Sequence, residues 1–121
     1  MHKFKKSQRI LKRKDFINKK TAQRKFCSKG VVLIFKKHQN VSMRLGLIVS
    51  KKVGNSVIRN LVKRRIRDIF RQLSDEQRQP GWDLIVIARN FAAKMQYKHL
   101  NHDVNRIIDK HLTYTRTTSR Q

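Results

Sequence analysis

The stretch RLGLIVSKKVGNSVIRNLVKRRIRDIFR, residues 44–71, contains the two patterns that decide the fold. Its first part, residues 44–50, is mostly apolar, which predicts a largely buried strand. A turn follows, in which Asn55 or Ser56 can cap the first free backbone amides of a helix. The helix is expected to run to about Leu73. A strand, a tight turn and a helix therefore follow one another directly.

The predicted helix has two chemically different sides. At 100° per residue, apolar side chains fall on one side, which would pack on a sheet. They are Ile58, Leu61, Val62, Ile66, Ile69 and, at the edge, Phe70. The opposite side is basic. It consists of Arg59, Asn60, Lys63, Arg64, Arg67 and Arg71.

The basic side has an unusual charge pattern. A solvated helix face normally alternates in sign, because like charges at i, i+4 repel each other. Here only Asp68 interrupts the basic residues. A solvated surface remains the alternative, but we favour a face that binds a polyanion. Lys51 and Lys52, together with the free amides of the helix N-terminus, would extend the same positive surface.

Further patterns flank this stretch on both sides. Residues 31–35 form a β-branched and aromatic run that predicts a strand, and residues 83–89 predict another. Apolar residues recur at helical spacing over residues 97–112 and predict a last helix. Since the connection between the strands at 31–35 and 44–50 is short, we expect them to be antiparallel neighbours.

The ends of the chain are more polar. Residues 1–9 are interpreted as a basic arm, and residues 10–20 allow a short helix. Residues 21–30 are predicted to be a loop, and residues 113–121 a polar, frayed tail. The expected fold is a single α+β domain over residues 10–112, in the order α-β-β-α-β-α, with a small central sheet packed with helices.

The whole chain is strongly basic. It has 121 residues, with 31 Lys and Arg against 7 Asp and Glu, for a formal net charge of +24. Such a chain repels itself, and a phosphate backbone is the densest common partner of opposite charge. A disordered tail could have the same charge, but 38% of the residues are apolar and come in runs long enough to build a core. We therefore predict a folded protein that binds nucleic acid, and we favour RNA.

The sequence does not indicate a membrane protein. No stretch approaches the roughly 20 apolar residues of a membrane helix. No segment has the pattern of an interfacial helix, and no apolar signal core follows the basic residues 1–14. The single cysteine, Cys27, excludes an internal disulfide and fits a reducing compartment. We therefore expect a cytoplasmic protein with no membrane partner.

The sequence contains no recognisable catalytic constellation. Of the seven acids, only Asp75 and Glu76 are adjacent, in a predicted loop, so no two-metal nuclease site is indicated. His99 and His102 would lie one turn apart on the last helix. No Cys or Glu partner is near them, so we interpret them as surface residues. We name no catalytic residue and no metal ligand in this chain.

Residues 44–68 closely resemble the signature of the protein subunit of bacterial ribonuclease P. The most specific part is Arg59-Asn60-x-x-Lys63-Arg64-x-x-Arg67, which follows Ser50-Lys51-Lys52. The resemblance extends upstream to Leu11, Asp15 and Phe16 and downstream to residues 83–89, and covers roughly residues 9–112. An ordered motif of this length is far more specific than a basic patch.

The resemblance implies both a fold and a function. The implied fold has the α-β-β-α-β-α order and an unusual left-handed βαβ crossover. The implied protein assists a catalytic RNA in removing the 5′ leader from precursor tRNA, by contacting the leader and raising the affinity for substrate and metal. The RNA and its magnesium would perform the hydrolysis. The implied partners are the catalytic RNA subunit and precursor tRNA, and the oligomeric state without RNA stays open.

The resemblance also implies roles for residues of this chain. Arg59, Asn60, Lys63, Arg64 and Arg67 would face the catalytic RNA, and the charge pattern adds Lys51, Arg65 and Arg71. Lys52 would lie near the substrate. The sheet beside the first helix would form a cleft for the single-stranded leader, held by stacking and charge. The expected leader-binding residues are Phe16, Lys20, Ile34, Ile48 and Lys52.

The chain departs from the family pattern inside these sites. Many members have an arginine where this chain has Leu61, and an apolar residue where it has Arg65. The two positions are one helical turn apart, so Arg65 would reach the region of the missing arginine, or would only extend over the edge of the core. Lys20 and Ile34 stand where the family often has aromatic residues. Phe26 and Phe35 are candidate replacements, although core packing is the simpler interpretation.

A different class of function stays open at this point. A structural RNA-binding protein of the ribosomal type would be equally small and basic. The ordered residues 44–68 favour the ribonuclease P subunit over that alternative. An architectural DNA-binding protein is less well supported, because neither a recognition-helix turn nor a minor-groove wedge is present.

Overall fold

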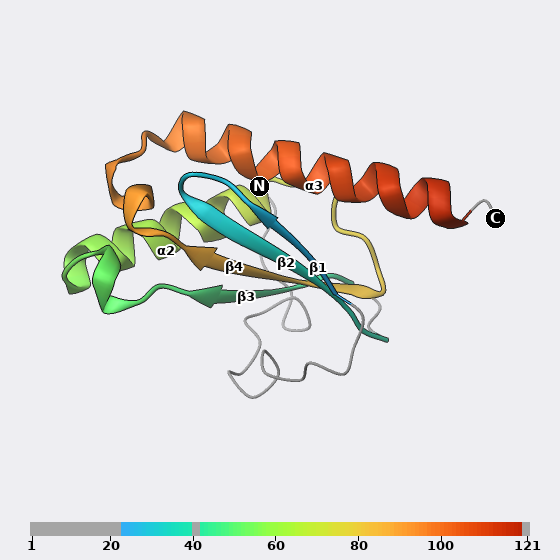
Figure 1. The fold of residues 1–121 in the computed structure, drawn as a ribbon, viewed down its shortest axis with the longest axis horizontal. Helices are drawn as coiled ribbons and strands as arrows, with labels where there is room; N and C mark the ends of the chain where they lie inside the picture. Colours follow the sequence, from blue (N-terminus) through green and yellow to red (C-terminus); the bar gives the residue numbers. More distant parts are fainter. Residues whose placement is uncertain (1–22, 40–41, 120–121) are drawn as a thin grey trace.

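The computed structural model describes residues 23–39 and 42–119. A four-stranded sheet is packed against two long helices (Figure 1). The strands are β1 (Gln23–Cys27), β2 (Val31–Lys37), β3 (Arg44–Ile48) and β4 (Trp82–Ala88). The helices are α2 (Ser56–Arg71) and α3 (Tyr97–Ser119), with the 3-10 helices η2 (Lys51–Val53) and η3 (Asn90–Lys94). The helix expected over residues 10–20, with Phe16 and Lys20, lies outside the described residues.

The sheet has the order β1-β2-β4-β3. β2 is antiparallel to both β1 and β4, whereas β3 is parallel to β4. The prediction that the strands at 31–35 and 44–50 are neighbours is therefore wrong, because β4 lies between them. β4 suits this central place because its residues from Leu84 to Val86 are apolar and are buried on both faces of the sheet. Arg44 binds Asp83 with Nε–Oδ1 and Nη2–Oδ2 distances of 3.0 and 2.8 Å, which ties β3 to β4.

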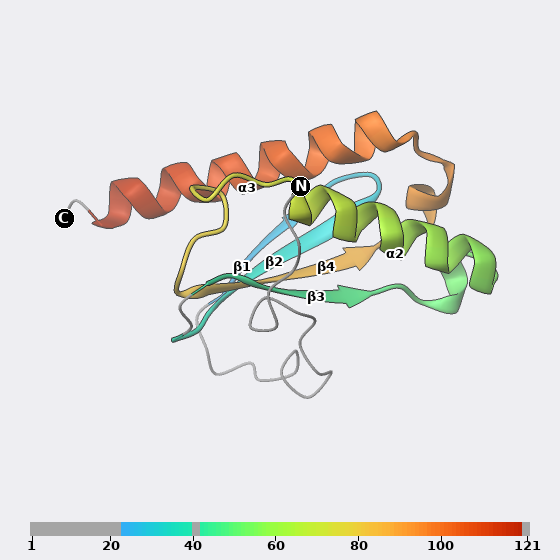
Figure 2. The same ribbon diagram turned by 180° about the vertical axis from the view of Figure 1, so that it is seen from behind.

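The β3-α2-β4 connection is left-handed. In Figure 2, β3 and β4 point the same way, α2 lies in front of the sheet, and β4 lies above β3. Parallel crossovers are right-handed in nearly all proteins, so this is a rare arrangement. The expected α+β fold and its crossover are confirmed. Within the described residues the order is β1-β2-β3-α2-β4-α3, one strand more than expected.

Both helices contribute to one core on the same face of the sheet. Val31, Leu33 and Phe35 of β2 alternate into it, which is the period of a strand. β4 adds Leu84, Val86 and Ala88, and the helices add Val62, Ile66, Ile69, Phe70, Leu100, Val104, Ile107 and Ile108. The alternate side chains form the second face of the sheet. This second face includes Cys27, Val32, Ile34, Ile85, Ile87 and Ile48.

Residues 23–27 were expected in a loop but form the edge strand β1. Charged residues hide its pattern, yet Arg24 and Phe26 pair with core residues of β2 while Lys25 faces the second face. Phe26 packs edge-to-face on Phe35, with ring centroids 5.8 Å apart. Lysine on an edge strand discourages pairing with other chains. The segment that was expected to be a loop is therefore an edge strand, and Lys25 protects it from pairing with other chains.

The frayed tail expected from residue 113 is also wrong in part, because α3 continues to Ser119. The extra turns have tertiary partners. Thr115 Oγ1 lies 2.7 Å from Gln79 Oε1, and Arg116 forms an ion pair with Glu76 at 3.0 Å. Arg24 lies over the Tyr114 ring at 3.6 Å. In the part of the chain that the structure describes, no helix has the length and apolarity needed to cross a membrane.

Candidate nucleic-acid interface

The helix α2 begins where the sequence predicted a cap. Asn55 Oδ1 accepts a hydrogen bond from the backbone amide of Ile58 at 3.0 Å. η2 immediately precedes this turn and carries Lys51 and Lys52, both exposed. A capped N-terminus with two exposed lysines beside it concentrates positive potential at this end of the helix.

The apolar side of α2 is buried as predicted along most of its length. Val62, Ile66 and Ile69 are each about 1% exposed. The first turn differs, because Val57 is 74% exposed and Ile58 36%. This end of α2 extends beyond the tips of β3 and β4, so no sheet lies beneath it (Figure 2). Leu61 is half-buried.

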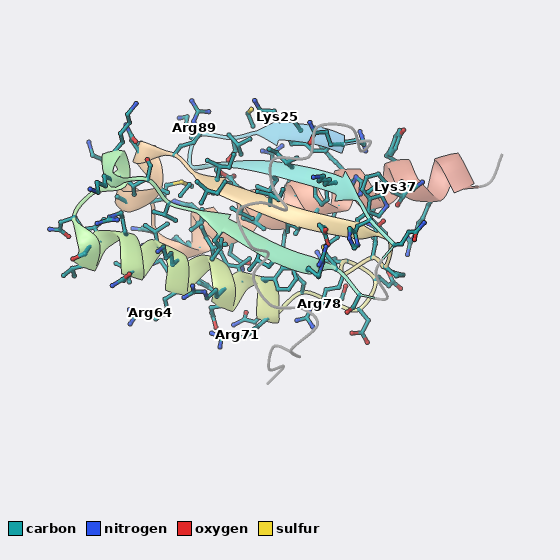
Figure 3. All side chains as sticks on the ribbon, turned by 90° about the horizontal axis from the view of Figure 1, so that it is seen from below. Lys25, Lys37, Arg64, Arg71, Arg78 and Arg89 are labelled. Atoms are coloured by element: carbon teal, nitrogen blue, oxygen red, sulfur yellow. The ribbon has the colours of Figure 1, made fainter. Side chains whose placement is uncertain are left out.

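The basic side of α2 is brought together as predicted. Asn60 and Arg64 are exposed, while Arg59, Lys63, Arg67 and Arg71 are half-buried. Figure 3 shows Arg64 and Arg71 projecting outward from the same helix. Among residues 23–39 and 42–119, Lys63, Arg64 and Arg67 form no ion pair with an acid. Their charges are available to an external anion.

Other basic side chains of α2 are held by the protein itself. Arg59 Nε donates to the carbonyl of Gly54 at 3.2 Å. Arg65 Nη1 donates to the carbonyl of Met95 at 3.1 Å, which draws Arg65 towards the start of α3. Arg71 lies 3.6 Å from Asp68. The basic side therefore combines anchored arginines with unpaired cations.

A small hollow of about 310 Å³ interrupts the basic side. Its lining residues are Arg64, Arg65, Asp68, Arg71 and Tyr97. Tyr97 Oη donates to Asp68 Oδ2 at 2.6 Å, joining α3 to α2. Burial, with Asp68 second, raises the pKa of Tyr97 to about 12, so the hydroxyl stays protonated as a donor. Sequence reasoning missed Tyr97, because the contact crosses two helices.

The expected leader-binding residues are only partly described. Ile34 and Ile48 are half-buried on the second face, with β4 between their strands. Ile34 pairs with Ile85, and Ile48 pairs with Ile87 in the adjacent register. Lys52 follows β3 in η2 and lies beyond the end of this face. The structure therefore places Ile34 and Ile48 on one face, separate from the basic side of α2.

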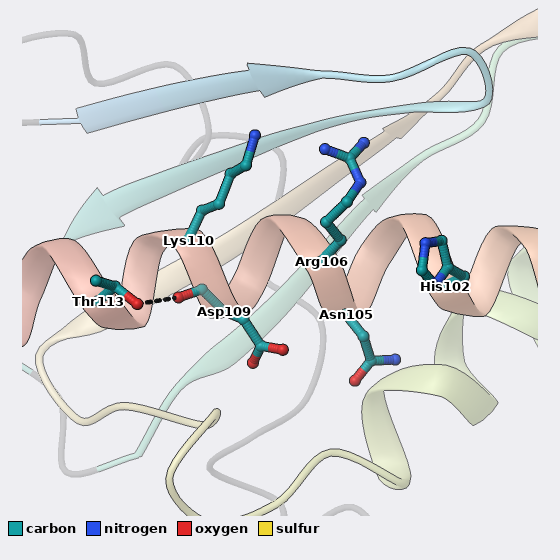
Figure 4. A pocket seen from close by; sticks show the side chains of 6 residues that line it. All are labelled: His102, Asn105, Arg106, Asp109, Lys110 and Thr113. Carbon is teal, nitrogen blue, oxygen red and sulfur yellow. Dashed lines mark hydrogen bonds between the residues drawn. The ribbon is translucent and has the colours of Figure 1, made fainter.

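The outer side of α3 has a further hollow, of about 410 Å³ (Figure 4). Its lining includes His102, Arg106, Asp109 and Lys110, so its charges are mixed. Thr113 Oγ1 donates to the Asp109 carbonyl at 3.0 Å. His99 and His102 are exposed, as expected for surface residues. Among the described residues, no three His, Cys, Asp or Glu side chains form a group that could hold a metal ion.

A buried histidine was not anticipated from the sequence. His111 of α3 is fully buried and stacks on Phe35, with ring centroids 3.9 Å apart. Its Nδ1 lies 3.3 Å from Arg24 Nη1. Burial, followed by the charge of Arg24, lowers the pKa of His111 to about 4. Nδ1 of the neutral ring can accept a hydrogen bond from Arg24. Because His111 is buried and stacked on Phe35, we interpret it as a core side chain.

A basic helix packed on the sheet of a small α+β fold defines a compact nucleic-acid-binding protein. The family model described as Ribonuclease P matches residues 4–112. A ribonuclease P protein component of Clostridium botulinum is 37% identical over 105 residues, covering 87% of this chain and 95% of that protein. One of Bacillus cereus is 38% identical over 111 residues, covering 88% and 92%. The chain belongs to the ribonuclease P protein family.

Solved structures agree with this assignment. A Staphylococcus aureus RNase P protein mutant with defective mRNA degradation activity superposes with a TM-score of 0.75 at 33% identity, covering 86% of this chain and 87% of that one. The RNase P protein of Thermotoga maritima gives a TM-score of 0.73 at 24% identity, covering 84% and 96%. At 24% identity, the similarity to the Thermotoga maritima protein supports the fold assignment alone.

Proposed function

We propose that this chain is the RNA-binding protein subunit of ribonuclease P and assists a catalytic RNA in removing the 5′ leader from precursor tRNA. The observation that carries the proposal is the ordered motif from Arg59 to Arg67, displayed on one side of α2 in a member of this family. The protein contacts the leader and raises the affinity for substrate and metal. A purely structural RNA-binding role does not account for the family membership.

The basic side of α2 is the proposed contact with the catalytic RNA. Lys63, Arg64 and Arg67 are unpaired among the described residues, so binding a phosphate costs no existing ion pair. Arginine can bind phosphate with two parallel hydrogen bonds, and lysine acts as a point charge. Lys51, Arg59, Asn60, Arg65 and Arg71 complete this contact.

The second face of the sheet is the proposed leader contact. Ile34 and Ile48 offer apolar surface there, and Lys52 offers charge at the end of β3. Phe16 and Lys20 belong to this proposal through the family pattern alone. An apolar surface with flanking cations suits a single strand, whose bases stack and whose phosphates need neutralising.

Arg65 is proposed to serve in place of the arginine missing at Leu61. Its hydrogen bond to Met95 O uses one of five guanidinium N–H donors. It also lines the hollow between Arg64 and Arg71, where a phosphate oxygen could reach the remaining donors. If Arg65→Ala leaves RNA affinity and its salt dependence unchanged, Arg65 serves only to join α2 to the start of α3.

Hydrolysis is assigned to magnesium held mainly by the RNA subunit. The family resemblance, and no residue of this chain, is the reason for assigning the metal to the RNA. No catalytic step is therefore placed on this chain. Its cations instead screen the phosphates that the substrate and the catalytic RNA bring together.

The deciding experiment is cleavage of precursor tRNA by the catalytic RNA at low magnesium, with and without this protein. We expect the protein to raise kcat/KM and to lower the magnesium concentration required. A lysine-rich protein of equal charge is the matched control for simple screening. Absence of stimulation beyond that control would favour the structural RNA-binding alternative.

A further inference from the structure

A hollow of about 460 Å³ lies where the β1–β2 turn meets the end of β4. It is lined by Cys27, Ser28, Lys29, Arg89 and Phe91. None of these residues belongs to the basic side of α2, and none was expected to bind leader. The hollow combines an aromatic ring with two cations, the pair of features that holds single-stranded nucleic acid.

Phe91 is exposed although its neighbours are fixed. It is 46% exposed, whereas Ala92 beside it is 1% exposed. The Ala92 amide donates to the Arg89 carbonyl at 2.9 Å, and the Arg89 amide donates to the Gly30 carbonyl at 2.8 Å. A Cβ at position 30 would collide with Met95 Sδ. Glycine at this position therefore allows the Met95 side chain to pack against the β1–β2 turn. η3 is thus clamped on the hairpin, and the Phe91 ring is presented outward on a fixed backbone.

Of the described residues that line the hollow, the two charged ones, Lys29 and Arg89, are both positive. No Asp or Glu occurs in residues 23–39 or 89–102. Arg89 Nη1 donates to the Ser28 carbonyl at 2.8 Å, which holds the guanidinium at the rim and leaves its other N–H groups for an acceptor. Lys29 is exposed in the turn. An anionic ligand therefore meets two cations within one small site.

The hollow continues the second face of the sheet. Cys27 pairs with Val32 and Val32 with Ile87, and Ile87 pairs with Ile48 across the sheet. Three strand spacings separate β3 from β1, or roughly 14 Å. Figure 3 shows Lys25 and Arg89 on the opposite side of the molecule from Arg64 and Arg71. The site thus lies along the proposed leader surface and away from the proposed contact with catalytic RNA.

We propose that this hollow binds one unpaired nucleotide of the precursor-tRNA leader, with its base stacked on Phe91 and its phosphate held by Lys29 and Arg89. This inference rests on the proposed function, since it extends the leader surface to the β1 corner of the sheet. Stacking does not depend on base identity, so the site accepts any base. It adds affinity only for leaders long enough to reach it.

The test measures the affinity of the holoenzyme for precursor tRNAs with long leaders, for one with a single-nucleotide leader, and for mature tRNA. Phe91→Ala is expected to weaken long-leader binding roughly 5- to 100-fold, the effect of losing one stacked base. Binding of the other two RNAs stays unchanged. Phe91→Trp retains the affinity. Tyr114→Ala is the matched control, because Tyr114 is 45% exposed but lies at the other end of the hairpin, beside Arg24.

A second measurement locates the nucleotide. Leader positions are replaced one at a time by abasic residues, and one position is expected to lower the affinity of the unaltered protein but not that of Phe91→Ala. Such non-additivity is the mark of a direct contact. Lys29→Gln is expected to reduce the slope of log affinity against log salt by roughly 0.7 for the long leader only.

The outcomes separate the two proposals. If the unaltered protein discriminates long leaders from mature tRNA but Phe91→Ala binds each RNA as tightly as the unaltered protein does, the subsite is wrong and the proposed function stands. Equal loss for long-leader and mature RNA also overturns the subsite. If the unaltered protein shows no leader dependence, both are overturned. Because Phe91 is exposed, the unfolding midpoint of Phe91→Ala should match that of the unaltered protein.

Discussion

At the scale of single residues, the side chains that the sequence marked most clearly are those whose role depends on one element alone. The row of cations on α2 and the cap at Asn55 follow from helical geometry and lie where they were expected. Tyr97, His111 and Phe91 were not foreseen. Tyr97 and His111 gain their roles from partners that are distant in the sequence. Phe91 stands out because it is exposed beside the buried Ala92. Local sequence patterns encode neither relation.

Lys63 offers the cleanest test of the basic side, because it makes no ion pair within the described residues. Lys63→Ala should weaken binding of the catalytic RNA and reduce the log–log salt slope by roughly 0.7 to 0.9, the effect of one phosphate contact. Arg59→Ala should do so too, with an added loss from its bond to Gly54. Lys110→Ala, on the outer side of α3, is the control. Unchanged slopes for Lys63→Ala and Arg59→Ala would place the contact elsewhere.

His111 predicts how stability depends on pH. Its folded pKa of about 4 lies below the usual 6.5, so the unfolded chain binds the extra proton. Stability should fall as pH drops from about 6.5 to 4, by at most roughly 3 kcal/mol from this group. His111→Phe keeps a ring against Phe35 and should flatten this part of the urea-unfolding profile. His102→Phe is the exposed control, and an equal slope in unaltered protein and His111→Phe would contradict the assignment.

At the scale of elements, the strands and helices with strong apolar periodicity were predicted, and those stabilised by tertiary contacts were not. β2, β4 and α2 fall within this first group. β1 was missed because one of its two inward side chains, Arg24, is charged, so only Phe26 marks its apolar side. The last turns of α3 were missed because Gln79 and Glu76, which hold them, are far away in the sequence. The neighbours of β3 were wrong because loop length does not reveal a strand that arrives later in the chain.

The start of α2 predicts a stability effect that belongs to the whole helix. Asn55→Ala removes the acceptor for the Ile58 amide and should lower the free energy of unfolding by about 0.5 to 2 kcal/mol. Asn55→Ser should restore most of it, because serine also caps. Chemical denaturation of the three proteins is the measurement. Equal stability for Asn55→Ala and the unaltered chain would mean that this cap adds nothing.

At the scale of the whole molecule, two cationic surfaces lie on different sides of one small sheet. One is the basic side of α2, and the other is the hairpin corner with Lys29 and Arg89. The proposed contact with catalytic RNA and the proposed leader subsite therefore share no side chain. The resemblance indicated the first surface from its motif. The second could not be predicted, since it combines a turn, a strand end and a 3-10 helix.

The net charge of +24 predicts how salt acts on the free protein. Raising the ionic strength from about 0.01 to 0.15 M shortens the screening length from roughly 30 to 8 Å. Self-repulsion should weaken, and the Tm should rise by roughly 4 to 8 °C for each 1 kcal/mol gained. Thermal unfolding at several salt concentrations measures this. A Tm that falls with salt over this range would show that the ion pairs outweigh the repulsion.

The central place of β4 has a consequence for the order of folding. β4 is the last strand in the chain, yet it joins β2 to β3. Until residue 88 has left the ribosome, β3 lacks its neighbour β4, and of the four described strands β1 and β2 alone can pair. A nascent chain ending before Trp82 exposes the apolar residues of α2 and β3 together with most of the positive charge. The sheet therefore closes as a late event that depends on long-range contacts, the kind that slows folding.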